Sequence, residues 1–207
     1  GVEEPMDFLA QSRLLDTVRR LIRRNAHTHL DRVIEKTQPA DLAHLLPRLS
    51  ERDTKFFLRV LALDEERAAE VLSNLEPKMA SEVIPLMEVE ALARVFRELA
   101  SDDATDLLQA LPQDLAHQIL EQMKGDDAAE VEELLRYGPK TAGGIMSTDF
   151  FVLNRDVSAR EAIAAMHGAE DAEMVFYIYC VNEQGHLVGT LSLRDLLTNP
   201  PETTLRA

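Results

Sequence analysis

A helical pattern of apolar residues that recurs about every 12 residues restricts the folds open to this chain. The spacing i, i+3, i+4, i+7 places apolar side chains on one face of a helix. Leu42, Leu45, Leu46 and Leu49 fill it first, Thr54, Phe57, Leu58 and Leu61 follow, and later copies start at Ala68, Ala80, Leu92, Ala104, Ala116 and Ala128. On one continuous helix, 12 residues of about 100° each would rotate the apolar stripe by roughly 120° per copy. The helices must therefore be short, with turns between them.

Helix breakers and N-cap residues separate most of these copies. They are Pro39, Ser50, Asp64, Pro77, Ser101, Pro112 and Gly125, and only the junction near Glu88 lacks such a signal. The last copy has Glu132 where an apolar residue is due, as expected where an array ends. Helices this short are not stable alone, so the sequence predicts a superhelical array that shares one core.

A separate helix is predicted before the array, at residues 8–24. Its arginines Arg19, Arg20, Arg23 and Arg24 lie along one flank by helical spacing. They could dock on an acidic segment of the chain or meet anionic lipid head groups. A solvated flank that pairs with nearby carboxylates is the simpler interpretation, because short basic clusters are common on surface helices.

The negative charge of the chain is concentrated in the middle of the sequence. The formal net charge is −15, and residues 61–135 alone hold 19 acidic and five basic residues. Such a field repels the phosphate backbone of nucleic acid, which excludes nucleic acid as a partner, and it attracts cations. A divalent ion or a basic partner domain would relieve the repulsion. The alternative is a solvated acidic face that only keeps the protein in solution.

The sequence contains no candidate for a membrane-spanning helix. Its longest apolar run, Met174 to Val181, is far shorter than the roughly 20 residues that a bilayer core requires. The single cysteine, Cys180, cannot form an internal disulfide and fits a reducing compartment. The opening Gly1 in place of Met indicates an excised fragment or a tag remnant.

From residue 137 onward the pattern changes from helical repeat to mixed α/β. Residues 149–153 predict a short strand, and Ser158 with Glu161 forms a capping box that begins a helix. Residues 174–181 predict a buried strand, and the turn at residues 182–185 leads into a second strand at 186–191. Ser192 with Asp195 is a second capping box, and Pro200 and Pro201 end the closing helix.

This β-α-β-β-α order ends in the run Gly189-Thr190-Leu191-Ser192-Leu193-Arg194-Asp195-Leu196, which resembles a CBS motif. The linker Tyr137-Gly138-Pro139-Lys140-Thr141-Ala142-Gly143-Gly144-Ile145-Met146 joins it to the acidic array. Together these parts resemble the cytosolic portion of an MgtE-type magnesium transporter. The resemblance implies a mainly α fold, with the superhelical domain at residues 1–136 and the first CBS motif at residues 137–207.

The resemblance also implies what is missing and where the chain acts. In that family a second CBS motif, a linker helix and a membrane pore follow, and the protein works as a homodimer. The chain is therefore expected to be a truncated regulatory fragment on the cytosolic side of the cell membrane, one that senses intracellular Mg²⁺ and gates the pore. The strand at residues 174–181 should leave an apolar surface that the second CBS motif would cover, so we expect self-association.

Two carboxylates on one predicted helix are the main candidates for a metal site. Asp102 and Asp106 stand at i, i+4, with Asp103 beside them, so two carboxylates can converge on one hard cation. The alternative is that Asp102 and Asp103 only favour a helix start, since carboxylates there meet the positive end of the helix dipole. The family resemblance favours the metal role and adds Glu70, and a Mg²⁺ ion held here should be weakly bound.

The resemblance also assigns a nucleotide, such as ATP in the complete CBS pair, to Tyr177, Arg194 and Asp195. An aromatic ring suits an adenine face, and a carboxylate suits the ribose hydroxyls. A purely structural role for these residues is equally open, because Asp195 completes a capping box and Tyr177 is part of a predicted strand.

No catalytic set is present, so the chain is predicted to be non-enzymatic. His27 and His29 have no zinc-ligand spacing, and Cys180 is expected to be a buried, inert thiol. The alternative to an ion sensor is a helical-repeat module that docks a protein partner. Its CBS motif would then be structural or would sense a nucleotide. A transmembrane segment in the full-length reading frame would distinguish the two.

Overall fold

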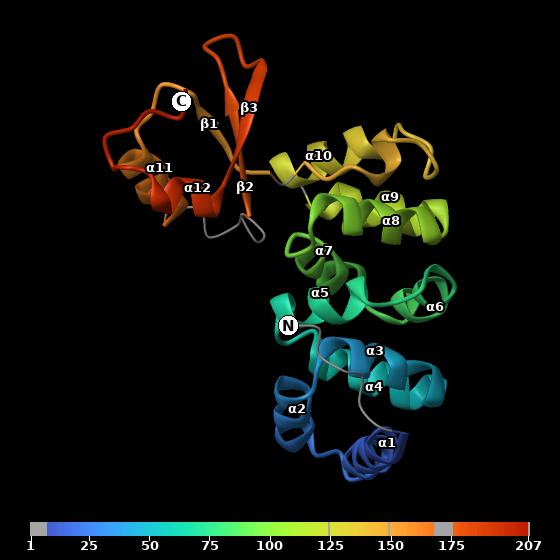
Figure 1. Cartoon of the computed structure of the whole chain (residues 1–207). Coiled ribbons are helices and arrows are strands. Elements are labelled where there is room, and N and C mark those ends of the chain that lie inside the picture. The colour runs from blue at the N-terminus through green and yellow to red at the C-terminus, as the bar shows by residue number, and fades with distance from the viewer. Residues whose placement is uncertain (1–7, 124, 149, 168–175, 207) are drawn as a thin grey trace. The chain divides into compact units, whose positions relative to one another are not determined.

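The computed structural model describes residues 8–123, 125–148, 150–167 and 176–206 of the chain. The chain divides into two compact units, Gly1–Met146 and Ser147–Ala207. The first is helical, and the second is a small sheet with helices (Figure 1). The predicted domain boundary after residue 136 stays a prediction.

The first unit is a stack of short helices (Figure 1). Its elements are α1 (Phe8–Arg23), α2 (His27–Lys36), α3 (Pro39–Leu45), η1 (Leu46–Arg48), α4 (Glu51–Leu61), α5 (Glu65–Ser73), α6 (Pro77–Val83), η2 (Ile84–Leu86), α7 (Val89–Val95), α8 (Ser101–Ala110), α9 (Gln113–Met123) and α10 (Asp126–Leu134). Helices α3, α5, α7 and α9 contact one another in one row, and α6, α8 and α10 do so in another. Alternate helices therefore share each row, and the predicted superhelical array is confirmed.

Local signals in the sequence explain where most of these helices begin. The Ser50 hydroxyl accepts a hydrogen bond from the Asp53 N–H at 3.2 Å, and the Asp64 carboxylate accepts one from the Arg67 N–H at 3.0 Å. Pro39 and Pro77 occupy first-turn positions, where the missing N–H costs no helical bond. Glu88 precedes α7 without a side-chain cap, so the packing of α7 has to fix that helix start.

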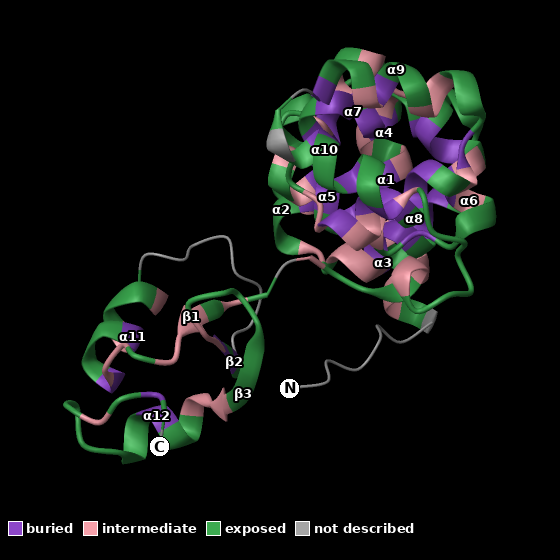
Figure 2. Ribbon diagram, turned by 90° about the horizontal axis from the view of Figure 1, so that it is seen from above, coloured by how far each residue is buried: buried purple, intermediate pink, exposed green. Residues whose placement is uncertain are grey.

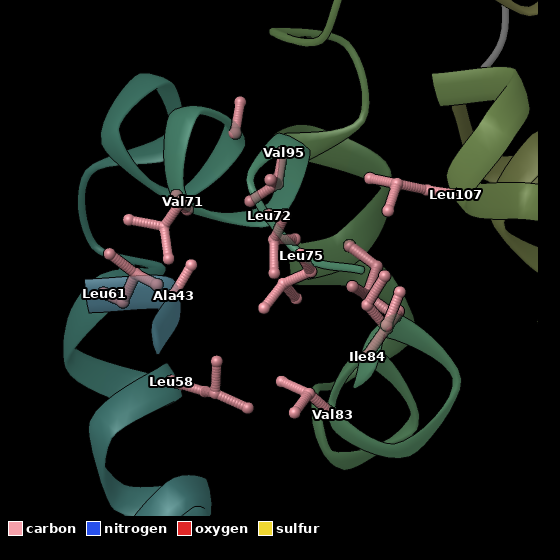
Figure 3. Close-up of a cluster of buried hydrophobic side chains, with 14 of the residues drawn as sticks. Ala43, Leu58, Leu61, Val71, Leu72, Leu75, Val83, Ile84, Val95 and Leu107 are labelled. Carbon is pink, nitrogen blue, oxygen red and sulfur yellow. The ribbon is translucent and has the colours of Figure 1, made fainter. Parts of the chain in front are cut away.

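The apolar positions of the repeat form the core of this unit. Phe57, Leu72, Ile84, Leu92 and Phe96 are all at most 1% exposed. Figure 3 shows Leu58, Leu61, Val71, Leu75, Val83 and Leu107 reaching into a shared cluster from successive helices. In Figure 2 the buried residues lie where helices meet, and exposed residues cover the outward faces. Each helix is thus stabilised by burying its apolar stripe against its neighbours.

Three details of the array differ from the sequence prediction. Helix α2 lies at residues 27–36, where no helix was predicted. Ala100, and not Ser101, is the N-cap residue of α8, and Ser101 is buried inside the first turn with its carbonyl accepting a hydrogen bond from the Thr105 hydroxyl. In α10 the buried residue at the end of the stripe is Leu134, while Leu135 is half-buried.

The linker after α10 folds into a tight turn within the first unit. The N–H and hydroxyl of Thr141 both donate to the Gly138 carbonyl, at 3.0 and 2.8 Å, and the Gly144 N–H donates to the Thr141 carbonyl. A Cβ atom on Gly143 would meet the Tyr137 ring at 2.5 Å, and one on Gly144 would overlap the Gly138 carbonyl. The two glycines are therefore required by close approach of the chain to itself.

The second unit is a three-stranded sheet, with β2 (Tyr177–Val181) between β1 (Val152–Asn154) and β3 (Leu187–Ser192). β1 runs parallel to β2, and β3 runs antiparallel to it. Helices α11 (Ala159–Met166) and α12 (Leu193–Thr198) complete the unit. The β-α-β-β-α order predicted from the sequence is confirmed, while residues 149 and 174–175 of the predicted strands lie outside the described residues.

Only one face of this sheet is buried. Ile178 and Cys180 of β2 are at most 2% exposed, and they pack in a core with Ala162 and Leu196 from the helices. Tyr177 and Tyr179 alternate with them and are 61% and 37% exposed. The strand is thus buried on one face and leaves on its other face the apolar surface that was expected from the sequence, because successive side chains of a strand point to opposite faces.

Both predicted capping boxes are confirmed in this unit. The Ser158 hydroxyl pairs with Glu161, and the Ser192 hydroxyl pairs with Asp195. The segment after α12 returns to α11, where the Ala159 N–H donates to the Thr203 carbonyl at 2.9 Å. Leu205 is buried there at 8% exposure, so the last residues belong to the core of this unit.

Replacing Gly144 with alanine should loosen the linker turn. The new methyl group overlaps backbone, which cannot move as a side-chain tip does, so we expect a loss of about 1–3 kcal/mol in the stability of the turn. Faster tryptic cleavage after Lys140 would report the opening. Gly138→Ala is the control in the same loop, since a Cβ there meets only the Thr141 methyl at 3.6 Å. Equal cleavage rates in the two variants would contradict this account.

Candidate metal and nucleotide sites

The carboxylates of α8 lie on the border of the buried stripe of that helix. Ala104, Thr105 and Leu108 face the core, while Asp102 is half-buried and Asp106 is exposed. Asp102 and Asp103 occupy the first turn, where the helix dipole favours negative charge. Asp106 lies one turn further on, so its position is not explained by the helix start.

Glu70 lies on α5, a helix that contacts α8, but it already has a cationic partner. The Arg67 guanidinium donates to the Glu70 carboxylate at 2.5 Å. Arg67 also donates to the carbonyl oxygens of Ile34 and Thr37 at the end of α2. Arg67 thus ties α5 to α2, and a metal ion at Glu70 would compete with this guanidinium.

Within the described part of the chain, no three His, Cys, Asp or Glu side chains lie close enough together to hold one metal ion. Asp102 and Asp106 on α8 and Glu70 on α5 therefore do not form a three-carboxylate cluster. Mg²⁺ commonly binds through one or two carboxylates and retains several waters. The arrangement can supply part of such a coordination sphere, with the remaining ligands coming from water or from another surface.

A groove of about 740 Å³ in the second unit brings two of the predicted nucleotide residues together. Tyr177 at the start of β2 and Arg194 in the first turn of α12 both line it. Phe176, Leu193 and Leu197 supply most of the apolar wall. An exposed aromatic ring beside a guanidinium can stack on a base and pair with a phosphate.

Asp195 does not line this groove and borders a separate, smaller cavity. Its carboxylate accepts a hydrogen bond from the Ser192 hydroxyl at 2.6 Å and one from the Ser192 N–H at 3.3 Å. These hydrogen bonds lower the pKa of the Asp195 carboxyl, with a smaller contribution from the charge of Arg194. The carboxylate is thus engaged in the capping box.

The sequence analysis missed Phe176 and Leu197 as residues of this groove. Both are large apolar residues with more than half of their surface exposed, at 62% and 63%. Leu197 follows Leu193 by four residues on α12, so helical spacing could have placed the two side chains on one face. Phe176 adjoins Tyr177 in sequence, but strand alternation alone would have sent it to the opposite face.

The remaining candidates show no chemistry of their own. Cys180 is buried at 2% exposure, as predicted, and desolvation raises the pKa of its thiol. His27 and His29 lie exposed on α2, and the His27 ring packs against Phe56 at a centroid distance of 4.6 Å. Among the described residues, no helix is long and apolar enough to cross a membrane.

Family models match both units of the chain. Residues 37–140 match the MgtE intracellular N domain, and residues 142–202 match the CBS domain. The fold and these matches define a protein in which a superhelical N domain precedes a CBS motif. The chain belongs to the MgtE family.

Curated relatives of the chain are named as magnesium transporters. The chain is 32% identical over 178 residues to magnesium transporter MgtE of Thermus thermophilus, which spans 84% of this chain and 39% of that protein. It is 29% identical over 171 residues to magnesium transporter MgtE of Bacillus subtilis, across 82% of this chain and 38% of that protein. The chain thus spans about two fifths of the length of these relatives.

Solved structures share the fold over nearly the whole chain. A crystal structure of the cytosolic domain of the Mg²⁺ channel MgtE in complex with ATP has a TM-score of 0.85 and 31% identity, over 93% of this chain and 78% of that one. The soluble part of a magnesium transporter has a TM-score of 0.83 over 95% of this chain and 77% of that one. At 24% identity the second structure supports the fold alone.

Removing the Ser192 hydroxyl should change how the second unit responds to acid. The pKa of the Asp195 carboxyl is lower in the folded state than in the unfolded state. The ionised carboxylate therefore stabilises the fold above the ordinary pKa of about 3.9, and this stabilisation is lost as the pH falls through the lower, folded-state pKa. Ser192→Ala removes the hydroxyl that donates to the Asp195 carboxylate. The difference in free energy of unfolding between wild type and variant should therefore become smaller as the pH falls through this range. Thermal unfolding across pH would measure the difference, and a constant difference would contradict this explanation.

Proposed function

We propose that the chain is the cytosolic regulatory part of an MgtE-type magnesium transporter, which senses intracellular Mg²⁺ and gates a membrane pore outside this sequence. The observation that supports this best is the 31% identity to the cytosolic domain of the Mg²⁺ channel MgtE across 93% of the chain. The net charge of −14 over residues 61–135 supports it independently, since such a field concentrates divalent cations. The chain acts as a non-enzymatic regulator.

In this proposal Asp102 and Asp106 are the main magnesium ligands of the helical unit. They follow one another by one turn of α8, with Asp102 half-buried and Asp106 exposed, so both carboxylates can face one ion at the surface. Glu70 of α5 is a further ligand, and its carboxylate gives up its ion pair with Arg67 when it binds the magnesium ion. The remaining ligands come from water and from the second CBS motif, which makes the ion weakly held.

Binding of this kind suits a sensor better than a permanent structural site. The like charges of residues 61–135 repel one another when no cation is bound, and a divalent ion between carboxylates removes that repulsion. The ion therefore favours the arrangement of helices and CBS motifs in which the carboxylates lie closest. If the ion binds one arrangement of the protein more tightly than another, the ion concentration controls which arrangement is populated and so whether a pore is open or closed.

The CBS groove is proposed as half of an ATP site. Tyr177 stacks on the adenine and Arg194 pairs with a phosphate, while Asp195 serves mainly as the helix cap and reaches the ribose only if its capping box opens. A second CBS motif supplies the other half. The relative crystallised with ATP supports the choice of this nucleotide.

The open face of the CBS sheet supports a homodimer or a paired CBS motif. Tyr179 lies opposite Val152 on β1 and Thr190 on β3, and the Phe150 ring contacts Tyr179 edge-on at 5.8 Å. Tyr177 and Leu187 of the same sheet are exposed by 61% and 62%. A second motif or a second copy would cover this apolar face.

Magnesium should stabilise the protein beyond the effect of ionic strength alone. At ten times its dissociation constant an ion that binds only the folded state adds about 1.4 kcal/mol, which a thermal shift resolves. The double variant Asp102→Asn with Asp106→Asn removes two charges at constant size. It should abolish the magnesium excess, which is the stabilisation by Mg²⁺ beyond that by NaCl at the same ionic strength. Glu70→Gln should reduce it less, because Arg67 competes for that carboxylate. Mg²⁺ and NaCl are compared at matched ionic strength, since screening also relieves repulsion.

Glu183→Gln is the control for the magnesium experiment, since Glu183 is exposed in the hairpin turn, far in sequence from α8. It should retain the full magnesium excess. Retention of the whole excess by the Asp102 and Asp106 double variant would show that the ion binds elsewhere. No excess in wild type would show that this chain alone has no preformed magnesium site.

The chain should self-associate through the open sheet face. Sedimentation velocity at several concentrations should show a dimer, and Tyr179→Lys should shift it toward monomer by placing a charge in the apolar contact. Leu63→Lys is the control, because Leu63 is 75% exposed on the helical unit. A wild type that stays monomeric at high concentration would count against a role for this face.

A further inference from the structure

A groove lined by arginines lies on α1, outside the acidic helices and the CBS motif. It has a volume of about 720 Å³, and its walls are Arg13, Asp16, Thr17, Arg20, Arg23 and Arg24. All four arginines are exposed; Arg13, Arg20 and Arg23 lie on α1 at spacings of seven and three residues, and Arg24 directly follows the helix. The groove thus gathers four positive charges and one negative charge on one side of a helix.

These arginines differ from the neighbouring Arg19, which is used to hold the fold. The Arg19 guanidinium donates to the Arg48 carbonyl at 2.6 Å and so ties α1 to the end of η1. In contrast, no ion pair between described residues includes Arg13, Arg20, Arg23 or Arg24. The expectation that this flank pairs with nearby carboxylates therefore finds no support among the described residues.

The spacing of these charges defines the ligand. Guanidinium groups bind phosphate oxygens through paired, fork-like hydrogen bonds. Arg13 and Arg23 are about 15 Å apart along α1, since a helix rises 1.5 Å per residue, so a single phosphate cannot contact the whole row. A chain of linked phosphates can do so, with Arg20, Arg23 and Arg24 on one end and Arg13 on the other. We propose that the α1 groove binds soluble polyphosphate anions.

A soluble anion fits the groove better than an anionic membrane does. The arginines line an open groove along a single helix, in which one small anion can contact several guanidiniums at once. The whole chain, these arginines included, carries a net charge of −15. An extended anionic surface would also meet carboxylates outside the groove, whereas a small anion in the groove senses mainly the nearest guanidiniums, because the Debye length at physiological salt is about 8 Å.

Binding of linear inorganic polyphosphate, long enough to follow the row of arginines and measured by calorimetry without divalent cations, tests the proposal. Wild type should bind at 0.15 M salt, and Arg20→Gln with Arg24→Gln should weaken binding by about tenfold or more, because charge-assisted hydrogen bonds are lost. Asp16→Asn should strengthen it by removing the one opposing charge. Omitting Mg²⁺ separates this result from the proposed magnesium sites, so either proposal can fail alone.

Arg52→Gln with Arg59→Gln is the charge-matched control on α4 and should leave the affinity unchanged, since both residues are exposed outside the groove. Thermal unfolding checks that every variant is folded. Equal affinity in the groove variant, or no binding by wild type, would overturn the proposal. Binding only to vesicles with phosphatidylglycerol would assign the groove to a membrane instead. Dissociation of a dimer by the groove variant without added anion would assign it to the acidic helices of a second copy.

Discussion

The short helices of the array are stable only because each one buries its apolar stripe against helices that precede and follow it. Leu72 of α5, Ile84 of η2 and Leu92 of α7 come from three different segments and are fully buried. This shared core fixes the direction of every helix, and with it the side on which polar residues appear. The carboxylates of α5 and α8 reach the surface because the opposite sides of those helices are committed to the core. A change in the packing would therefore move the proposed magnesium ligands as a group.

Charge is distributed over this scaffold in two opposed regions. The acidic residues between 61 and 135 repel one another, and the packed helices hold them in place despite that repulsion. Arg67 neutralises one of them locally, while it also donates to the end of α2. The arginines of α1 form the opposite region at the start of the stack. A cation sensor and an anion groove can therefore coexist on one unit, because both charge fields decay within about 10 Å at 0.1 M salt.

The CBS unit follows a different rule, since its sheet has only one face covered. Ile178 and Cys180 pack on the helices, whereas Tyr177 and Tyr179 remain accessible. Strand periodicity predicts this alternation, and the apolar composition of residues 174–181 agrees with an open apolar face. Apolar composition alone cannot distinguish a strand that is buried within its own chain from one that awaits a partner. The capping box of Asp195 was predicted from the sequence, but that Arg194 lines the groove while Asp195 does not is visible only in the structure.

The sequence by itself determined the helical array, the two capping boxes, the hairpin and the order of the strands. These features depend on contacts between residues a few positions apart, and helical or strand periodicity records such contacts directly. The tertiary structure decided what depends on distant neighbours. It formed α2 without a strong local signal, buried Ser101 inside the first turn of α8, tied Arg67 to the end of α2, and brought Phe176 and Leu197 to the same CBS groove. Each of these outcomes depends on segments that meet only after the chain has packed, so no local pattern could specify them.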